Sequence, residues 1–177
     1  MKLRLAQGLA RTDAAKTEAL LGDLQADAQT ALEDLRDLAR GIYPPLLADQ
    51  GLAAALEAQA RRSPIRVEVH GDGVGRYPQA VESAVYFCTL EALNNVAKYA
   101  DASSATIDLQ QTNGRLTFSV TDDGRGFDPS VMSYGTGLQG MADRLDAIEG
   151  TLDVTSEPGA GTTVTGRIDV EPVEAAP

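Results

Sequence analysis

The stretch SATIDLQQTNGRLTFSVT, residues 104–121, contains two short runs in which apolar and polar residues alternate. Such alternation is typical of half-buried strands, because successive side chains of a strand point to opposite faces of a sheet. The runs at 104–111 and 116–121 are joined by Thr112-Asn113-Gly114, and Asn-Gly is a strong signal for a tight hairpin turn. The sequence therefore predicts an antiparallel hairpin here.

Helix and strand patterns alternate on both sides of this hairpin. A helix is predicted over 78–99, where apolar residues recur at spacings of three and four: Val81, Val85, Cys88, Ala92, Val96 and Tyr99. The other predicted elements are a helix at 51–60, a strand at 65–70, a loop at 122–136, a helix at 138–149 ending before Gly150, and strands at 152–156 and 162–170. Hairpins separated by helices predict an α+β fold, a two-layer α/β sandwich with a mixed sheet.

The N-terminal region has a different period. Residues 13–42 carry a seven-residue apolar repeat: Leu21, Leu24, Ala28, Ala31, Leu35, Leu38 and Ile42. This repeat keeps one seam facing a partner helix, so we favour a bundle or dimer seam over a helix packed on its own domain. Residues 1–11 are interpreted as the end of a preceding helix. Tyr43-Pro44-Pro45 ends the long helix, because proline lacks the backbone N–H group.

Composition excludes several classes of protein. Hydrophobic residues make up 43% and charged residues 23% of the 177 residues, as in ordinary soluble globular proteins. Cys88 is the only cysteine and His70 the only histidine, which rules out an internal disulfide, a cysteine-rich zinc site and a multi-histidine metal site. No apolar run is long enough to span a bilayer and no signal peptide is evident, so we expect a cytoplasmic chain.

The net charge of −11 is concentrated in the later part of the chain. Residues 1–62 carry 8 Lys and Arg against 9 Asp and Glu, whereas the remainder carries 7 against 17. This acidic balance argues against nucleic acid as a partner. It also means that any phosphate site would need a metal ion, helix N-termini and a few local cations.

Three polar residues share one stripe of the helix predicted over 78–99. At 100° per residue, Glu91, Asn95 and Lys98 are neighbours on the helix surface. An amide oxygen suits Mg²⁺ and an ammonium suits phosphate oxygens, so the stripe is compatible with a metal-bound phosphate. The alternative is a solvated face with a Glu–Lys contact.

Two glycine-containing segments follow the hairpin. Asp122-Asp123-Gly124-Arg125-Gly126-Phe127 comes directly after a strand, and its glycines would let the backbone pass close to a ligand. Gly135-Thr136-Gly137-Leu138 opens a helix, whose free N–H groups and dipole can hold an anion. Each is weak evidence alone: the first could be an ordinary acidic turn, and the second lacks both a dinucleotide fingerprint and a P-loop lysine.

Together, in this order, the segments resemble the ATP-binding domain shared by sensor histidine kinases, Hsp90-type chaperones, type II topoisomerases and mismatch-repair ATPases. EALNNVAKYA (residues 91–100) resembles its N box, and Asp122-x-Gly124-x-Gly126 its first glycine box. Gly135-x-Gly137-Leu138 is similar to its second glycine box, and residues 159–162 to its closing Gly-Thr segment.

Within this superfamily the chain is most similar to histidine kinases of the nitrate-sensor or desaturase-sensor type. The similarity is carried by LRDLARGIYPPLL at 35–47, GLAAAL at 51–56 and GLQGMADR at 137–144. It implies a partial dimerisation hairpin over 1–47 that lacks the phosphoacceptor segment, an ATP-binding catalytic domain over 48–170, and a disordered tail over 171–177.

The resemblance also implies roles for individual residues. The implied nucleotide-binding residues are Asn94, Asn95, Lys98, Asp122, Gly124, Gly126, Gly135, Thr136, Gly137, Leu138 and Thr162. Among them, Asn95 would coordinate Mg²⁺ through ATP, Asp122 would accept from the adenine amine, and Thr162 would complete the adenine pocket. Glu91 is the implied catalytic residue, which would orient or activate a nucleophile near the metal.

The chain departs from these kinases in two respects. Tyr99 stands where they usually have histidine, and no histidine precedes His70, so the phosphoacceptor is absent. We therefore expect ATP binding, with phosphoryl transfer to a histidine outside this chain. The implied partners are a response regulator and, in the full-length protein, a second copy of the chain. The resemblance leaves open whether the full-length protein has a membrane anchor. The alternatives are a serine-kinase or anti-sigma-type regulator and a catalytically inactive ATP-binding interaction module.

Overall fold

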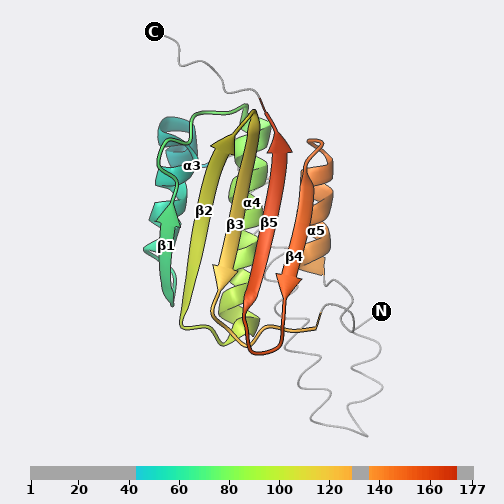
Figure 1. Cartoon of the computed structure of the whole chain (residues 1–177). Helices are drawn as coiled ribbons and strands as arrows, with labels where there is room; N and C mark the ends of the chain where they lie inside the picture. The colour runs from blue at the N-terminus through green and yellow to red at the C-terminus, as the bar shows by residue number, and fades with distance from the viewer. Residues whose placement is uncertain (1–42, 129–135, 171–177) are drawn as a thin grey trace, which may run out of the picture. The chain divides into compact units, whose positions relative to one another are not determined.

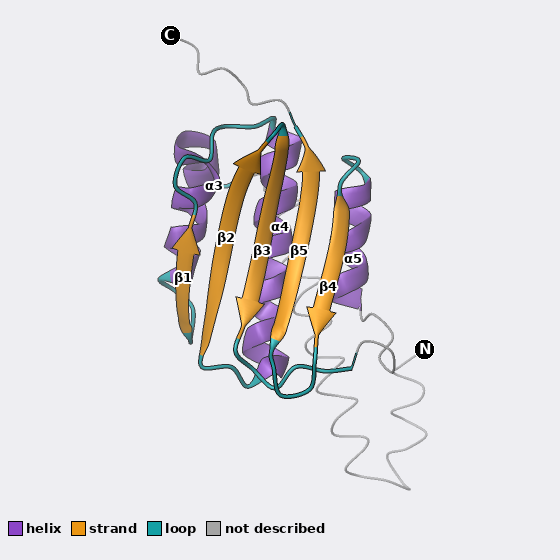
Figure 2. Cartoon of the chain, viewed as in Figure 1, coloured by secondary structure: helices purple, strands orange, loops and turns teal. Residues whose placement is uncertain are grey.

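The computed structural model describes residues 43–128 and 136–170, which form a two-layer α+β sandwich. Figures 1 and 2 show a mixed sheet whose helices all lie on one face. In chain order the elements are α3 (Pro45–Ala60), β1 (Arg66–His70), α4 (Gln79–Asn95), the π-helical turn η1 (Val96–Ala100), β2 (Ser104–Thr112), β3 (Arg115–Asp122), α5 (Thr136–Asp146), β4 (Thr151–Ser156) and β5 (Thr162–Asp169). The predicted fold class is confirmed.

The sheet has five strands in the order β1-β2-β3-β5-β4. Only β1 and β2 run parallel, and every other neighbouring pair is antiparallel. The predicted hairpin is confirmed as β2–β3, and its turn residues Asn113 and Gly114 both have positive φ angles, of 52° and 73°. These angles suit the tight turns whose twist matches that of paired strands.

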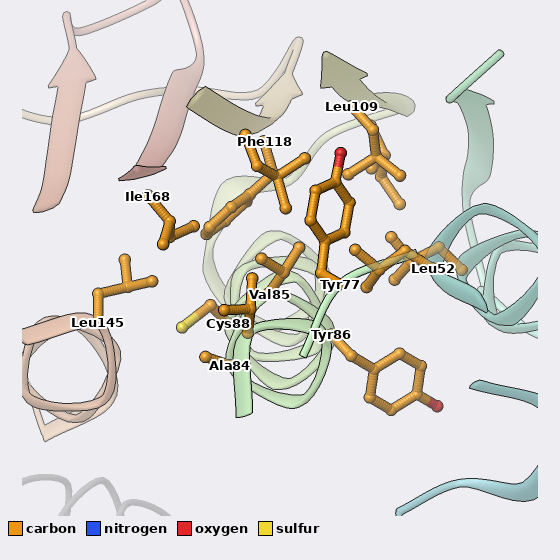
Figure 3. Close-up of a cluster of buried hydrophobic side chains, with 14 of the residues drawn as sticks. Leu52, Tyr77, Ala84, Val85, Tyr86, Cys88, Leu109, Phe118, Leu145 and Ile168 are labelled. Atoms are coloured by element: carbon orange, nitrogen blue, oxygen red, sulfur yellow. The ribbon is translucent and has the colours of Figure 1, made fainter. Parts of the chain in front are cut away.

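The core lies between α4 and the inner face of the sheet. Figure 3 shows Val85 of α4 directed towards Phe118 of β3, while Cys88 of α4 points to the side of α5, where its Sγ bonds to Met141 O; all of these side chains are buried. Gly166 pairs with Phe118 across the sheet, and a Cβ there would lie 2.0 Å from the Phe118 ring. Any side chain at 166 would therefore displace the Phe118 ring, and truncating a buried ring of this kind to alanine costs about 3–5 kcal/mol.

The helix predicted over 78–99 changes its winding near the end. α4 ends at Asn95, and Val96–Ala100 form the π-helical turn η1. A π turn holds more residues than an α turn, so later side chains fall behind the 100° rotation of an α-helix. The prediction that Tyr99 lies on the buried face is wrong for this reason: Tyr99 is 55% exposed, and Ala100 is buried instead.

Two other predicted helices have different bounds. α3 begins at Pro45, six residues before the predicted start, because proline suits the first position of a helix. A φ of 80° at Gly51 interrupts its helical geometry there. α5 ends at Asp146, earlier than predicted, and the residue in the left-handed region beyond it is Glu149, at φ 58°, rather than Gly150. The Gly150 N–H closes the helix end on Leu145 O at 2.9 Å.

A buried carboxylate fixes the start of the domain. Glu82 on α4 is 0% exposed and accepts hydrogen bonds from Arg76 Nε at 2.8 Å, from the Tyr77 N–H at 3.0 Å and from the Tyr43 hydroxyl. Burial alone would raise the pKa of Glu82, but these donors outweigh it and the pKa is lowered. Arg76 also donates to Ala48 O at 2.8 Å, so the cluster joins α3, α4 and the segment before α3.

The chain divides into two units, 1–42 and 43–177. The predicted hairpin over 1–47 lies, apart from its last five residues, outside the described residues, and so does the predicted tail over 171–177. Among residues 43–128 and 136–170, no helix is long and apolar enough to cross a bilayer.

Glu82→Gln should destabilise the domain by about 1–3 kcal/mol, because it removes the charge that Arg76 and Tyr43 face in a buried site. Since the pKa of Glu82 is lowered, its stabilising contribution is present above the ordinary glutamate pKa and is lost as the pH falls through the lowered value. Urea unfolding from pH 7 to pH 3 measures both effects. Glu68→Gln, on an exposed strand, is the matched control and should change stability by less than about 0.5 kcal/mol. Equal losses in the two variants would contradict the assignment.

Candidate functional site

A row of inward-facing residues crosses one end of the sheet. The strand register aligns Ala105 of β2 with Asp122 of β3, Asp122 with Thr162 of β5, and Thr162 with Ser156 of β4. Side chains at paired positions lie on the same face, which here is the face that α4 covers. At this end of the sheet the inward positions of β3, β5 and β4 are therefore polar, whereas the next inward positions along each strand are apolar.

Asp122 is the only acidic residue in this row and is 6% exposed. Its Oδ1 accepts from the Gly124 N–H at 2.8 Å. Burial raises the pKa of this carboxyl, and hydrogen bonding from the Gly124 and Thr162 backbones only partly opposes the shift. A nearly buried carboxylate with spare acceptor capacity can receive a hydrogen-bond donor from a ligand.

The glycines of the first box are required by contacts within the protein. A Cβ on Gly124 would lie 2.4 Å from Ala100 O, at the end of η1. A Cβ on Gly126, which has a φ of 55°, would lie 2.0 Å from Glu157 O in the β4–β5 loop. Between them, the Arg125 N–H donates to Ala100 O at 2.7 Å. These contacts join three loops at the same end of the sheet, and the predicted approach of these glycines to a ligand stays a prediction.

Asp123, beside Asp122, bonds to the chain just before and at the start of β2. Its carboxylate accepts from the backbone N–H groups of Ser103 and Ser104 at 2.8 and 2.9 Å, and from both of their hydroxyls. These donors hold the pKa of Asp123 well below its usual range. Asp123 thus fastens the loop after β3 to the start of β2 and leaves the inward position to Asp122.

The structure brings the N box and the second glycine box together. Gly137 is the second residue of α5, and a Cβ on it would lie 2.3 Å from Glu91 Oε1 and 3.6 Å from Asn95 Nδ2. The Glu91 carboxylate therefore lies beside the N-terminal turn of α5, where the helix dipole favours negative charge. Glu91 and Asn95, one turn apart on α4, face α5 as a pair.

The remaining predicted site residues occupy varied environments. Asn94 is half-buried at the end of α4, and Lys98 is exposed in η1 rather than on an α-helical stripe. Thr136 is the exposed first residue of α5, and Leu138 packs against the main core. Gly135 lies outside the described residues.

Sequence reasoning missed Ser156. This residue is 7% exposed, and its Oγ bonds to the Phe127 N–H, to Gly161 O and to Thr162 Oγ1, each at 2.9 Å. The alternation Leu152, Val154, Ser156 places it at an inward position, so a polar residue at that point of the pattern was the available signal.

Comparison with known proteins identifies the family to which these features belong. Residues 80–172 match the family described as histidine kinase-, DNA gyrase B- and HSP90-like ATPases. The chain belongs to this ATPase family. The matched range spans α4 to β5 and includes Glu91, Asn95 and the row from Asp122 to Ser156. These residues thus form an ATPase domain of the superfamily that the resemblance implied.

Relatives of this ATPase domain include two curated proteins. The chain is 37% identical over 147 residues to the sensor histidine kinase MctS of Rhizobium johnstonii, covering 78% of this chain and 32% of MctS. It is 30% identical over 148 residues to the histidine-protein kinase/phosphatase DegS of Brevibacillus brevis, covering 80% and 38%. The chain therefore spans about a third of the length of these relatives.

A solved structure shows the same fold. The histidine kinase domain of the Erythrobacter litoralis EL346 blue-light activated kinase aligns with a TM-score of 0.53 at 26% identity, covering 67% of this chain and 57% of that one. MctS, DegS and the blue-light activated kinase are all histidine kinases, so none of them favours the serine-kinase or inactive-module alternatives.

The contact between Gly137 and Glu91 predicts a coupling that unfolding experiments can measure. A Cβ added to Gly140, also in α5, would have no heavy atom within 4 Å, so Gly140→Ala should stabilise the domain by about 0.5–1 kcal/mol. Gly137→Ala should bring no gain, because the new methyl group displaces the Glu91 carboxylate. In a Glu91→Ala background, Gly137→Ala should become more favourable, whereas Gly140→Ala keeps its effect. Additive effects of Gly137→Ala and Glu91→Ala would contradict this contact.

Proposed function

We propose that this ATPase domain binds Mg-ATP and transfers the γ-phosphoryl group to a histidine outside this chain, as part of two-component signal transduction. The observation that supports it most is the apposition of Gly137 with Glu91 and Asn95. It joins a helix N-terminus, an amide and a carboxylate at one place, next to the polar end of the sheet. The sensor histidine kinases among the relatives support the same reaction.

In this proposal the adenine base is held at the polar row. Asp122 accepts a hydrogen bond from the exocyclic amine of adenine, and Thr162, the neighbouring inward residue on β5, completes the pocket. Gly124 and Gly126 form the adjoining wall, because their loop is packed against Ala100 and Glu157. A buried carboxylate is costly without a partner, so pairing with a ligand donor favours binding.

The phosphates are proposed to lie between α4 and α5. The N–H groups in the first turn of α5, around Thr136 and Gly137, have no acceptor within the helix, and they and the helix dipole favour an anion. Lys98 adds a cation, and so does Arg125, whose backbone is bonded to Ala100 two residues after Lys98. Asn94 adjoins this group at the end of α4.

The residues present fit a nucleotide-borne magnesium ion. The described residues contain no group of three or more His, Cys, Asp or Glu that could hold a metal unaided. Asn95 supplies an amide oxygen, a donor of the kind that Mg²⁺ prefers, and the other ligands of the ion would be waters and phosphate oxygens. Bound there, the ion would neutralise phosphate charge as the transfer proceeds.

Glu91 is proposed to act on the nucleophile. During transfer, the bond between the γ-phosphorus and the ADP oxygen breaks as a bond to an imidazole nitrogen forms. The Glu91 carboxylate orients the imidazole by accepting from its other N–H, and the contact with Gly137 holds that carboxylate in place. For the whole protein we propose a second copy of the chain and a response regulator as partners, the latter receiving the phosphoryl group from the histidine.

Asp122→Asn and Asn95→Ala should each weaken binding of Mg-ADP at least about tenfold, by loss of the adenine acceptor and of a metal ligand respectively. Titration calorimetry measures this, with Asp153→Asn on the outer face of β4 as the matched control. Because burial raises the pKa of Asp122, the affinity for ADP should begin to fall, as the pH is lowered, at a higher pH than it would with an ordinary aspartate. Absence of ADP binding by the unaltered chain would refute the proposal.

Glu91→Gln should abolish phosphoryl transfer while leaving Mg-ADP affinity within about threefold, because Glu91 acts on the nucleophile rather than on the base. The assay supplies a histidine-bearing dimerisation helix as a separate polypeptide with γ-labelled ATP, and scores acid-labile phosphohistidine. Glu57→Gln, at an exposed position of α3, is the matched control and should transfer normally. Acid-stable phosphoserine as the product would favour the anti-sigma-type alternative instead.

A further inference from the structure

Ser156 has its full set of hydrogen bonds in this structure. A serine hydroxyl offers one hydrogen and two acceptor sites. Gly161 O is a carbonyl and can only accept, so the Ser156 hydrogen points to it at 2.9 Å. The Phe127 N–H can only donate, and it fills one acceptor site at 2.9 Å. The remaining partner, Thr162 Oγ1 at 2.9 Å, must then donate to the second acceptor site.

This assignment determines what Thr162 can offer to a ligand. With its only hydroxyl hydrogen directed at Ser156, Thr162 Oγ1 keeps acceptor sites and no donor. Thr162 is half-buried, so its side chain is not sealed from the pocket. A free threonine hydroxyl could rotate and serve either as donor or as acceptor, and Ser156 removes that freedom.

Thr162 lies next to Asp122 in the strand register, on the same face of the sheet. An ionised carboxylate is also an acceptor without a hydrogen. The end of the sheet therefore presents two neighbouring acceptors. A 6-amino purine carries two amine hydrogens that can meet them, whereas a 6-oxo purine has one hydrogen on that edge, at N1, and sets its carbonyl as a third acceptor against them.

We propose that Ser156 is a specificity-determining positioning residue: by holding Thr162 as an acceptor, it makes the pocket select 6-amino purines over 6-oxo purines. Ser156 acts through Thr162 and does not itself touch the base. This inference rests on the proposed placement of adenine at Asp122. A site whose buried acceptors bond to hydrogens of the ligand rejects an analogue that presents an acceptor in their place, because the buried groups of the site are left unpaired.

The test compares ADP with inosine diphosphate, whose base has a 6-oxo group and an N1–H in place of the amine and the unprotonated N1, both with Mg²⁺. The measured quantity is the ratio of the two dissociation constants for the 177-residue chain, obtained by calorimetry. We expect at least about tenfold preference for ADP in the unaltered chain, and a fall of about fivefold or more in this ratio for Ser156→Ala. Thr155→Ala, which removes a hydroxyl from the neighbouring exposed position of β4, is the matched control and should retain the preference.

A purely structural role for Ser156, in tying the loops at Phe127 and Gly161 together, would lower both affinities by one factor and leave the ratio unchanged. That result would overturn the inference. A double-mutant cycle sharpens it: Thr162→Val should lower the ratio, and adding Ser156→Ala should lower it no further. An additional drop in the double variant would also overturn it.

A variant that does not fold and a chain that does not bind nucleotide can each be distinguished from a failure of the inference. If Ser156→Ala does not fold by thermal melting, Ser156→Cys keeps the volume with a weaker acceptor, and it should lower the ratio in the same direction. An unchanged ratio in that variant counts against the inference. If the unaltered chain binds neither nucleotide, the proposed ATP site fails and the inference fails with it. ADP binding with an unchanged ratio in the variants refutes the role of Ser156 alone.

Discussion

The placement of a carboxylate at the last inward position of β3 is the constraint on which the site depends. Leu116, Phe118 and Val120 fill the earlier inward positions and belong to the core, so Asp122 follows them into a region that excludes water. The free-energy cost of burying the charged carboxylate is reflected in the raised pKa of Asp122. Such a cost is tolerated where a ligand relieves it, and consistent local rules are most often broken at functional sites.

The glycines around Asp122 are explained by this placement. A Cβ on Gly161 would lie 2.0 Å from the Asp122 carbonyl oxygen, and one on Gly126 2.0 Å from Glu157 O. The loop after β3 and the loop between β4 and β5 can therefore approach only as bare backbone. The glycine boxes of this family are thus, in this chain, first a requirement of protein packing. Any approach to the nucleotide builds on loops that are already fixed against each other.

The sequence predicted the sheet better than the ends of the helices. Alternation and the Asn113-Gly114 turn located β2 and β3 to within one residue, because the period of a strand is short and its turn chemistry is specific. The exposure of Tyr99 was not predictable from a fixed 100° rotation, since the chain changes from α to π winding at Val96. The pairing of Gly137 with Glu91 joins residues 46 positions apart, and no local pattern carries it. The resemblance named both residues, but the contact that links them needed three-dimensional coordinates.

Because the domain is acidic, the proposed nucleotide site depends on the few Lys and Arg residues close to it. Residues after 62 carry 7 Lys and Arg against 17 Asp and Glu, so the long-range field repels a nucleotide. The field is screened over about 8 Å at physiological salt, so contacts inside the site outweigh distant charges. Lys98 in η1 and Arg125 in the loop after β3 are brought into one neighbourhood by the bond from Arg125 N–H to Ala100 O. Because Gly124 is what allows that loop to reach Ala100, the same glycine that fits beside Asp122 also brings the backbone of Arg125 close to η1, which carries Lys98, the other cation of the proposed phosphate site.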